Sequence, residues 1–116
     1  MTLQTCYEQM GASLDEVLGR LGSEALIKRF IKKFPQDPSF DALKSAIAAG
    51  SVEDGFRAAH TMKGVCLNLG LTQLYTLSSD ITEKLRAGVF EGCPELFAQL
   101  EERYQQAIES ISQLDD

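Results

Sequence analysis

Apolar residues recur along most of the chain at spacings of three and four, which is the pattern of helices with one buried face. Strand-like alternation of apolar and polar residues is nearly absent. Serines and glycines at the ends of the apolar stripes mark where helices begin and end. The segments expected to be helical are 2–10, 13–21, 23–49, 51–69, 71–88 and 94–111.

Two prolines interrupt the segment 23–49, because proline lacks a backbone N–H and clashes with the preceding turn of a helix. Asp37 followed by Pro38 predicts an N-cap and a first helical residue. We therefore expect 23–49 to be one long element with a kink. Pro94 is expected at the first position of the last helix.

Four long helices joined by short connections must pack as antiparallel neighbours. The pattern therefore predicts an all-α fold, an antiparallel up-down-up-down four-helix bundle with a short N-terminal helical extension. We expect residues 1–22 to form that extension, packed on a bundle of residues 23–116, in a single domain overall. A chain of 116 residues with 44% hydrophobic content is sufficient for one core of this kind.

Composition limits the possible environments and partners. No apolar run is long enough to span a membrane, and the first residues lack the basic and apolar regions of a signal peptide. We therefore expect a cytoplasmic protein, and the initial methionine with its extra helices favours a free-standing one. The formal net charge of -6 argues against nucleic-acid binding. The odd, widely spaced cysteines Cys6, Cys66 and Cys93 are interpreted as buried reduced thiols.

The only histidine of the chain, His60, lies in the segment 51–69. At about 100° per residue, it points nearly opposite the apolar residues Met62 and Leu69, and therefore outward. Lys63 and Gly64 fall within about 60° of His60 on the same helix. An imidazole, an ammonium group and a patch of bare backbone thus share one exposed stripe, together with the apolar residue one turn further on, Leu67.

This stripe meets the needs of phosphoryl transfer. A neutral imidazole is a good nucleophile towards phosphorus, and a nearby cation such as Lys63 stabilises charge on the phosphoryl oxygens. A glycine interior to a helix costs roughly 1 kcal/mol relative to alanine, so Gly64 needs a reason. We interpret Gly64 as the opening through which the active site of a partner approaches His60. Phe56 and Leu67, apolar residues that flank the histidine, are candidates for docking.

The segment Ala59-His60-Thr61-Met62-Lys63-Gly64, followed by Leu69-Gly70, resembles the signature of histidine-containing phosphotransfer (HPt) domains of two-component phosphorelays. Met62 stands where the family usually has leucine, and Val65 is bulkier than the small residue common there. The resemblance covers roughly residues 23 to 114.

The resemblance implies a phosphoryl carrier with no ATP site of its own, not an enzyme. Its partners would be receiver domains and a hybrid sensor histidine kinase. The chain would need no cofactor, because the partner receiver domain supplies Mg²⁺, and we expect a monomer. His60 would accept the phosphoryl group from a receiver aspartyl phosphate. The basic residues Arg57, Lys32 and Lys33 would contribute to docking, because the mouth of a receiver active site is acidic.

Two other functions remain open at this point. The bundle could be an HPt-like adaptor that binds receiver or kinase domains without carrying phosphate, although the intact set of His60, Lys63 and Gly64 argues against it. A metal-binding or cofactor-binding bundle has little support, because the chain lacks the repeated Glu-x-x-His pattern of di-metal bundles.

Overall fold

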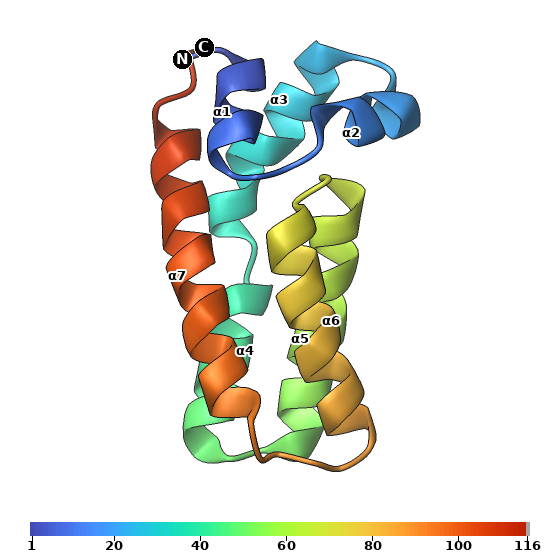
Figure 1. Ribbon diagram of the computed structural model, residues 1–116, viewed down its shortest axis with the longest axis vertical. Helices are drawn as coiled ribbons and strands as arrows, with labels where there is room; N and C mark the ends of the chain where they lie inside the picture. The colour runs from blue at the N-terminus through green and yellow to red at the C-terminus, as the bar shows by residue number, and fades with distance from the viewer. Residues whose placement is uncertain (116) are drawn as a thin grey trace.

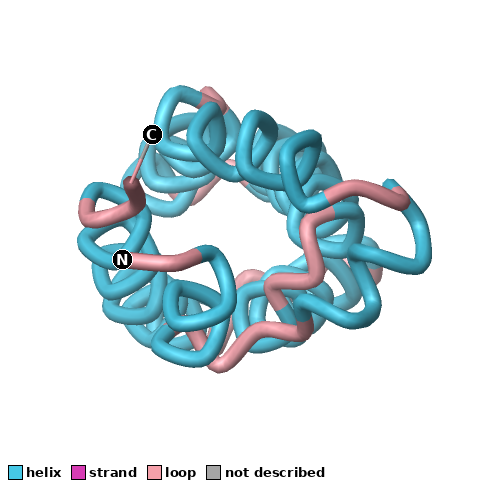
Figure 2. The backbone as a smooth tube through the Cα atoms, turned by 90° about the horizontal axis from the view of Figure 1, so that it is seen from above, coloured by secondary structure: helices cyan, strands magenta, loops and turns pink. Residues whose placement is uncertain are grey.

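The computed structural model describes residues 1–115, which are mainly helical and contain no strand (Figures 1 and 2). The all-α class expected from the sequence is therefore confirmed. Residue 116, the last of the predicted bundle, lies outside the described residues. The helical elements are α1 (Leu3–Gln9), α2 (Leu14–Leu21), α3 (Glu24–Lys33), the 3₁₀ turn η1 (Phe34–Gln36), α4 (Ser39–Ala49), α5 (Val52–Asn68), α6 (Thr72–Arg86) and α7 (Cys93–Ser112).

The segment 23–49 is not one kinked helix, as the sequence predicted, but two helices separated by η1. Asp37 has an extended backbone, with φ -68° and ψ 128°, which breaks the helical path completely. Helix α4 begins at Ser39 rather than at Pro38, although the carboxylate oxygen of Asp37 accepts a hydrogen bond from the backbone N–H of Ser39 at 2.9 Å. The last helix likewise begins one residue earlier than predicted, at Cys93.

The longer helices lie side by side along the 40 Å axis of the molecule. In Figure 1 the colour runs down through α3 and α4, up through α5, down through α6 and up through α7. Helix α5 packs between α4 and α6, α6 packs on α7, and α7 contacts α4. Viewed down the long axis, the helices surround a common centre (Figure 2).

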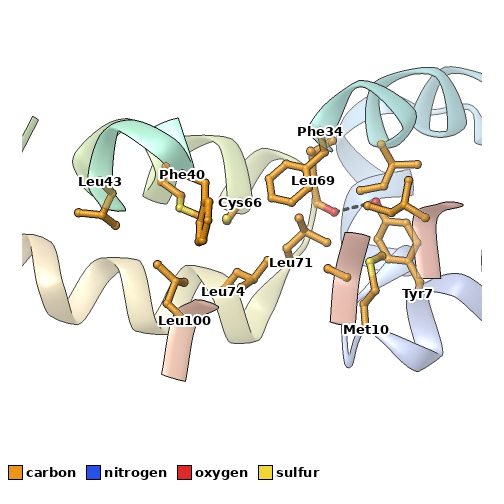
Figure 3. Packing of buried hydrophobic residues seen from close by; sticks show 14 of the residues in the cluster. Tyr7, Met10, Phe34, Phe40, Leu43, Cys66, Leu69, Leu71, Leu74 and Leu100 are labelled. Atoms are coloured by element: carbon orange, nitrogen blue, oxygen red, sulfur yellow. Dashed lines mark hydrogen bonds between the residues drawn. The ribbon is translucent and has the colours of Figure 1, made fainter. Parts of the chain in front are cut away.

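The core fills that centre with aliphatic and aromatic side chains (Figure 3). The rings of Phe40 and Tyr104 stack with their centroids 3.8 Å apart, which ties α4 to α7. Leu43, Leu71 and Leu100 are essentially inaccessible to solvent. All three cysteines are buried and carry free thiols, as the sequence predicted.

The two N-terminal helices close one end of the molecule over the turn between α5 and α6 (Figure 1). The hydroxyl of Tyr7 donates to the carbonyl oxygen of Leu69 at 2.7 Å, shown by the dashed line in Figure 3. The N–H of Ser13 donates to the carbonyl oxygen of Gly70 at 3.0 Å. Gly70 has φ +68°, and a Cβ there would also lie 2.6 Å from the Ser13 oxygen. Gly70 therefore ends α5 and also allows the N-terminal segment to approach closely.

No helix among residues 1–115 combines the length and hydrophobicity that crossing a membrane requires.

Candidate functional site

The site is built on α5, which begins and ends at well-defined caps. The side chain of Ser51 accepts a hydrogen bond from the N–H of Asp54 at 3.2 Å, and Glu53 and Asp54 occupy the first turn. The face towards the core consists of small and apolar residues: Gly55, Ala58, Ala59, Met62 and Cys66.

His60 lies on the opposite, exposed side of α5. Met62 is fully buried and Leu69 is nearly so, which agrees with the outward direction predicted for the histidine. Lys63 is half-buried one turn further on, and Leu67 is 44% exposed. The structure therefore places the predicted stripe on one continuous surface of a single helix.

Gly64 is an open position on this stripe. A Cβ built on its backbone would meet no atom within 4 Å, and its backbone is ordinary right-handed helix. By contrast, a Cβ on Gly55, in the same helix, would lie 2.9 Å from the Cδ1 atom of Leu85. Packing within the chain thus explains glycine at position 55 but not at position 64.

Phe56 and an arginine that the sequence analysis missed, Arg86, extend the site towards α6. The ring of Phe56 lies 5.8 Å from the ring of His60, centroid to centroid. The guanidinium carbon of Arg86 lies 5.0 Å from the centroid of the Phe56 ring, a cation–π distance. Arg86 also bonds through Nε to the carboxylate of Glu83 at 3.3 Å. A cation from α6 is thus held over the ring of Phe56, which in turn neighbours the imidazole of α5.

The sequence did contain a signal for Arg86. Helices α5 and α6 are antiparallel and joined by a short turn at Gly70, so residues at equal distances from that turn become neighbours. Phe56 and Arg86 satisfy this condition approximately. Pairing the residues of α5 and α6 across their connecting turn therefore points to Arg86 as a neighbour of Phe56.

The three cations predicted to take part in docking, Arg57, Lys32 and Lys33, have different surroundings in the structure. Arg57 is exposed and forms ion pairs with Asp54 at 2.8 Å and Glu53 at 3.6 Å. The hydrogen bond from Arg57 lowers the pKa of the Asp54 carboxyl. Lys33 lines a groove together with residues of α5, whereas Lys32 is half-buried on α3 and does not line that groove. Of the two lysines, only Lys33 therefore shares a groove with residues of α5.

Within residues 1–115, no group of three or more His, Cys, Asp and Glu side chains is placed to hold a metal ion. The most strongly perturbed thiol belongs to Cys66, where burial raises the pKa to about 12. This side chain is part of the core rather than of the exposed stripe.

A small all-helical domain that presents one exposed histidine, next to a lysine and an open glycine, has the form of a phosphoryl carrier. The comparison with protein families agrees, because the family model of the Hpt domain matches residues 3–110, nearly the whole chain. The chain belongs to the Hpt domain family. The match begins within α1, further upstream than the resemblance in the sequence suggested.

No curated protein and no solved structure gave a significant match. Membership of the family implies phosphotransfer in two-component signalling, and domains of this family are phosphocarriers that interact with receiver domains and kinases.

Proposed function

We propose that this chain is a phosphorelay carrier that accepts a phosphoryl group on His60 from a receiver aspartyl phosphate and passes it to the aspartate of another receiver. The observation that carries the proposal is the exposure of His60 on α5 beside Gly64, where a Cβ would meet no atom of another segment within 4 Å. A partner can therefore bring its carboxylate close to the imidazole without displacing any part of this protein.

The transfer step requires only groups that the two partners supply. An imidazole nitrogen lone pair attacks phosphorus, the bond between phosphorus and the aspartyl oxygen breaks, and the receiver carboxylate leaves with the electron pair. The N–P bond forms, and the imidazole ring nitrogen that carried a proton loses it to solvent. The reverse attack by another receiver carboxylate regenerates His60. Mg²⁺ bound by the receiver neutralises charge on the phosphoryl oxygens during both steps.

Lys63 and Arg86 would supply positive charge on this protein's side. Lys63 is one turn from His60, and its half-buried side chain limits the directions that the ammonium group can take. Arg86 is held over Phe56, whose ring in turn lies against the imidazole ring. Both cations would stabilise the charge on the phosphoryl group during transfer.

The remaining features of the proposal concern docking and context. Phe56, Arg57, Leu67, Lys32 and Lys33 would form parts of the receiver-docking surface. We propose a cytoplasmic monomer whose phosphoryl group originates from a hybrid sensor histidine kinase. Residues 1–22 would act as an extension packed on the bundle that carries His60, within one domain.

The test is incubation with a panel of receiver domains phosphorylated with radiolabelled phosphate. We expect at least one receiver to label the wild-type chain and none to label His60→Gln. The label should be lost in acid and stable in base, as for phosphohistidine. Equal labelling of His60→Gln and the wild type would refute the proposal. Tight receiver binding without any labelling would favour the adaptor function instead.

A further inference from the structure

An open groove of about 670 Å³ lies between α2, α3, η1 and the C-terminal half of α5. Most of its exposed surface is apolar and comes from three different helices, through Leu21, Phe30 and Val65. Clefts of roughly 300–1,000 Å³ with mainly apolar walls and a few polar groups are the usual form of small-molecule sites. The size and the lining of this groove therefore suit a small organic ligand.

The ring of Phe30 remains open to solvent at the groove. It is 39% exposed, whereas Ile27 and Ile31 on the same helix are fully buried. Among residues 1–115, the other large apolar side chains that are exposed are Leu67 and Val89. Covering an aromatic ring with an apolar group removes its surface from water, which is favourable. Phe30 thus offers a ligand a source of binding free energy that the fold itself does not use.

The groove faces away from His60. At about 100° per residue, Val65 and Leu69 lie about 140° and 180° around α5 from the histidine. A molecule in the groove would therefore leave the exposed stripe of His60, Lys63 and Gly64 uncovered. The groove is a separate surface, and its occupant need not be a molecule that engages the histidine.

The charges that line the groove favour an anion. Arg20 is already engaged by an ion pair with Glu16 at 3.3 Å and by a hydrogen bond to the carbonyl oxygen of Leu67. The carboxylate of Asp37 accepts hydrogen bonds from both polar groups of the serine two residues further on. Lys33 is exposed at the groove and forms no ion pair within residues 1–115. Its ammonium group is therefore the charge left for a ligand.

A second apolar hollow, at the other end of the molecule, has the opposite charge balance. Its lining includes the apolar residues Val89 and Leu96, but also two carboxylates, Asp80 and Glu83, against one cation, Lys84. The groove has two cations against one carboxylate, in a chain whose formal net charge is -6. Of these two hollows, the groove is thus the one that attracts an anion with an apolar body.

We propose that this groove binds a small amphipathic organic anion, with its apolar body against Leu21, Phe30 and Val65 and its carboxylate beside Lys33. The ligand would bridge α2, α3 and α5. It would therefore hold the N-terminal helices on the bundle, and its binding would stabilise the folded chain. The inference is independent of the function proposed for His60.

The test uses anilinonaphthalene sulfonate, an amphipathic anion that fluoresces when bound. Phenylnaphthylamine, which has the same aromatic body without the sulfonate, is its uncharged match. We expect the wild type to bind one molecule of either probe. Lys33→Glu should weaken binding of the sulfonate at least fivefold and that of the amine less than twofold, whereas Phe30→Ala should weaken both at least fivefold. Decanoate, a simple amphipathic carboxylate, should displace the sulfonate and should raise the midpoint of thermal unfolding more for the wild type than for Lys33→Glu.

Two substitutions in the other hollow are matched controls. Lys84→Glu reverses the charge of an exposed lysine, and Val89→Ala shortens a side chain that is 43% exposed. Both should leave the affinity for each probe within twofold of the wild type. All four variants are first checked for a wild-type circular dichroism spectrum, which separates loss of the site from loss of the fold.

Sulfonate affinities within twofold of the wild type for Lys33→Glu and Phe30→Ala would overturn the inference. So would a wild-type dimer that Phe30→Ala dissociates in sedimentation, because the groove would then be a contact between copies of this chain. Phe30-dependent binding to phosphatidylglycerol vesicles, without displacement of the sulfonate by decanoate, would assign the groove to a membrane surface and overturn it as well. None of these measurements involves phosphate on His60, so failure of the inference and failure of the proposed function are distinguishable.

Discussion

The hydroxyl of Tyr7 donates a buried hydrogen bond to the carbonyl oxygen of Leu69 across 2.7 Å, and so ties the first helix to the end of the helix that carries His60. Burial raises the pKa of Tyr7 well above its usual range, so this hydroxyl remains a donor at all physiological pH values. The contact joins two segments that are distant in the sequence.

Removal of that hydroxyl should destabilise the fold. We expect Tyr7→Phe to lower the free energy of unfolding by about 1–3 kcal/mol, because the carbonyl oxygen of Leu69 would lose its buried partner. Urea denaturation followed by circular dichroism measures the change. Tyr75→Phe is the control, since Tyr75 is half-buried on α6 and its hydroxyl forms no hydrogen bond within residues 1–115. Equal effects of the two substitutions would remove the special role of Tyr7.

Substitution of Gly64 should have opposite effects on stability and on transfer. Gly64→Ala should stabilise the chain by about 0.5–1 kcal/mol, because alanine favours a helix interior and the new Cβ meets open space. Gly64→Gln should slow transfer from a phosphorylated receiver at least tenfold, because its longer side chain covers the approach to His60. The free energy of unfolding is measured by urea denaturation, and the rate of transfer is measured by single-turnover labelling.

Two other glycines serve as controls for that experiment. Gly19, in α2, has equally open space, so Gly19→Ala should also stabilise the chain. Gly55→Ala should destabilise it, because the new Cβ would lie 2.9 Å from the side chain of Leu85. Unchanged receiver transfer by Gly64→Gln would contradict the access argument.

Lys63→Ala should affect transfer rather than folding. We expect a rate of phosphoryl transfer at least tenfold lower, because the ammonium group no longer stabilises charge on the phosphoryl oxygens. The free energy of unfolding should change by less than about 0.5 kcal/mol, as for most surface substitutions. Lys44→Ala provides the control, since Lys44 forms a surface ion pair with Glu101 on the α4–α7 side of the molecule. A large loss of stability in Lys63→Ala would make the lysine structural.

Arg86→Ala should slow transfer in a salt-dependent way. At low ionic strength we expect a severalfold loss, because the guanidinium group over Phe56, the ring that neighbours His60, contributes positive potential at the site. The loss should shrink at high salt, where exposed charges are screened. Arg103→Ala, on α7, should leave transfer unchanged at both salt concentrations. A salt-independent loss would indicate that Arg86 acts by positioning Phe56 instead.

The buried thiol of Cys66 predicts how stability depends on alkaline pH. Burial raises its pKa from 9.0 to about 12, so between these values the unfolded chain ionises this thiol and the folded chain does not. The contribution of the protonated thiol to the free energy of unfolding is therefore complete below pH 9. It is lost as the pH rises towards 12, at up to about 1.4 kcal/mol per pH unit. Cys66→Ala should reduce this slope in urea denaturation between pH 9 and 11. An identical slope would show that Cys66 does not cause it.

The helical segments were predictable because capping and stop residues are local signals. Ser13, Ser23 and Ser51 each accept the hydrogen bond expected of an N-cap, from the N–H three residues ahead. The break after Lys33 was underestimated, because the extended backbone of Asp37 and its bond to Ser39 depend on three-dimensional geometry that spacing does not describe.

The candidate site was predictable only along one helix. The exposure of His60 and the burial of Met62 follow from a 100° rotation per residue, which the sequence specifies. The residues that other helices place next to His60 and its stripe do not follow from this rotation. Arg86 reaches the site through the pairing of α5 with α6, and the groove at Phe30 exists only because α2 folds back towards the end of α5. The roles assigned to these residues stay predictions for the experiments above.

The two ends of the described chain meet at one end of the molecule, where the N-terminal ammonium group contacts the carboxylate of Asp115 at 2.8 Å (Figure 1). His60 lies near the middle of α5, well along the 40 Å axis from that contact. Fluorophores attached near residues 1 and 115 would therefore report whether the two ends of the described chain stay in contact. They would do so without covering the face proposed to exchange phosphate, so folding and phosphotransfer could be followed in the same sample.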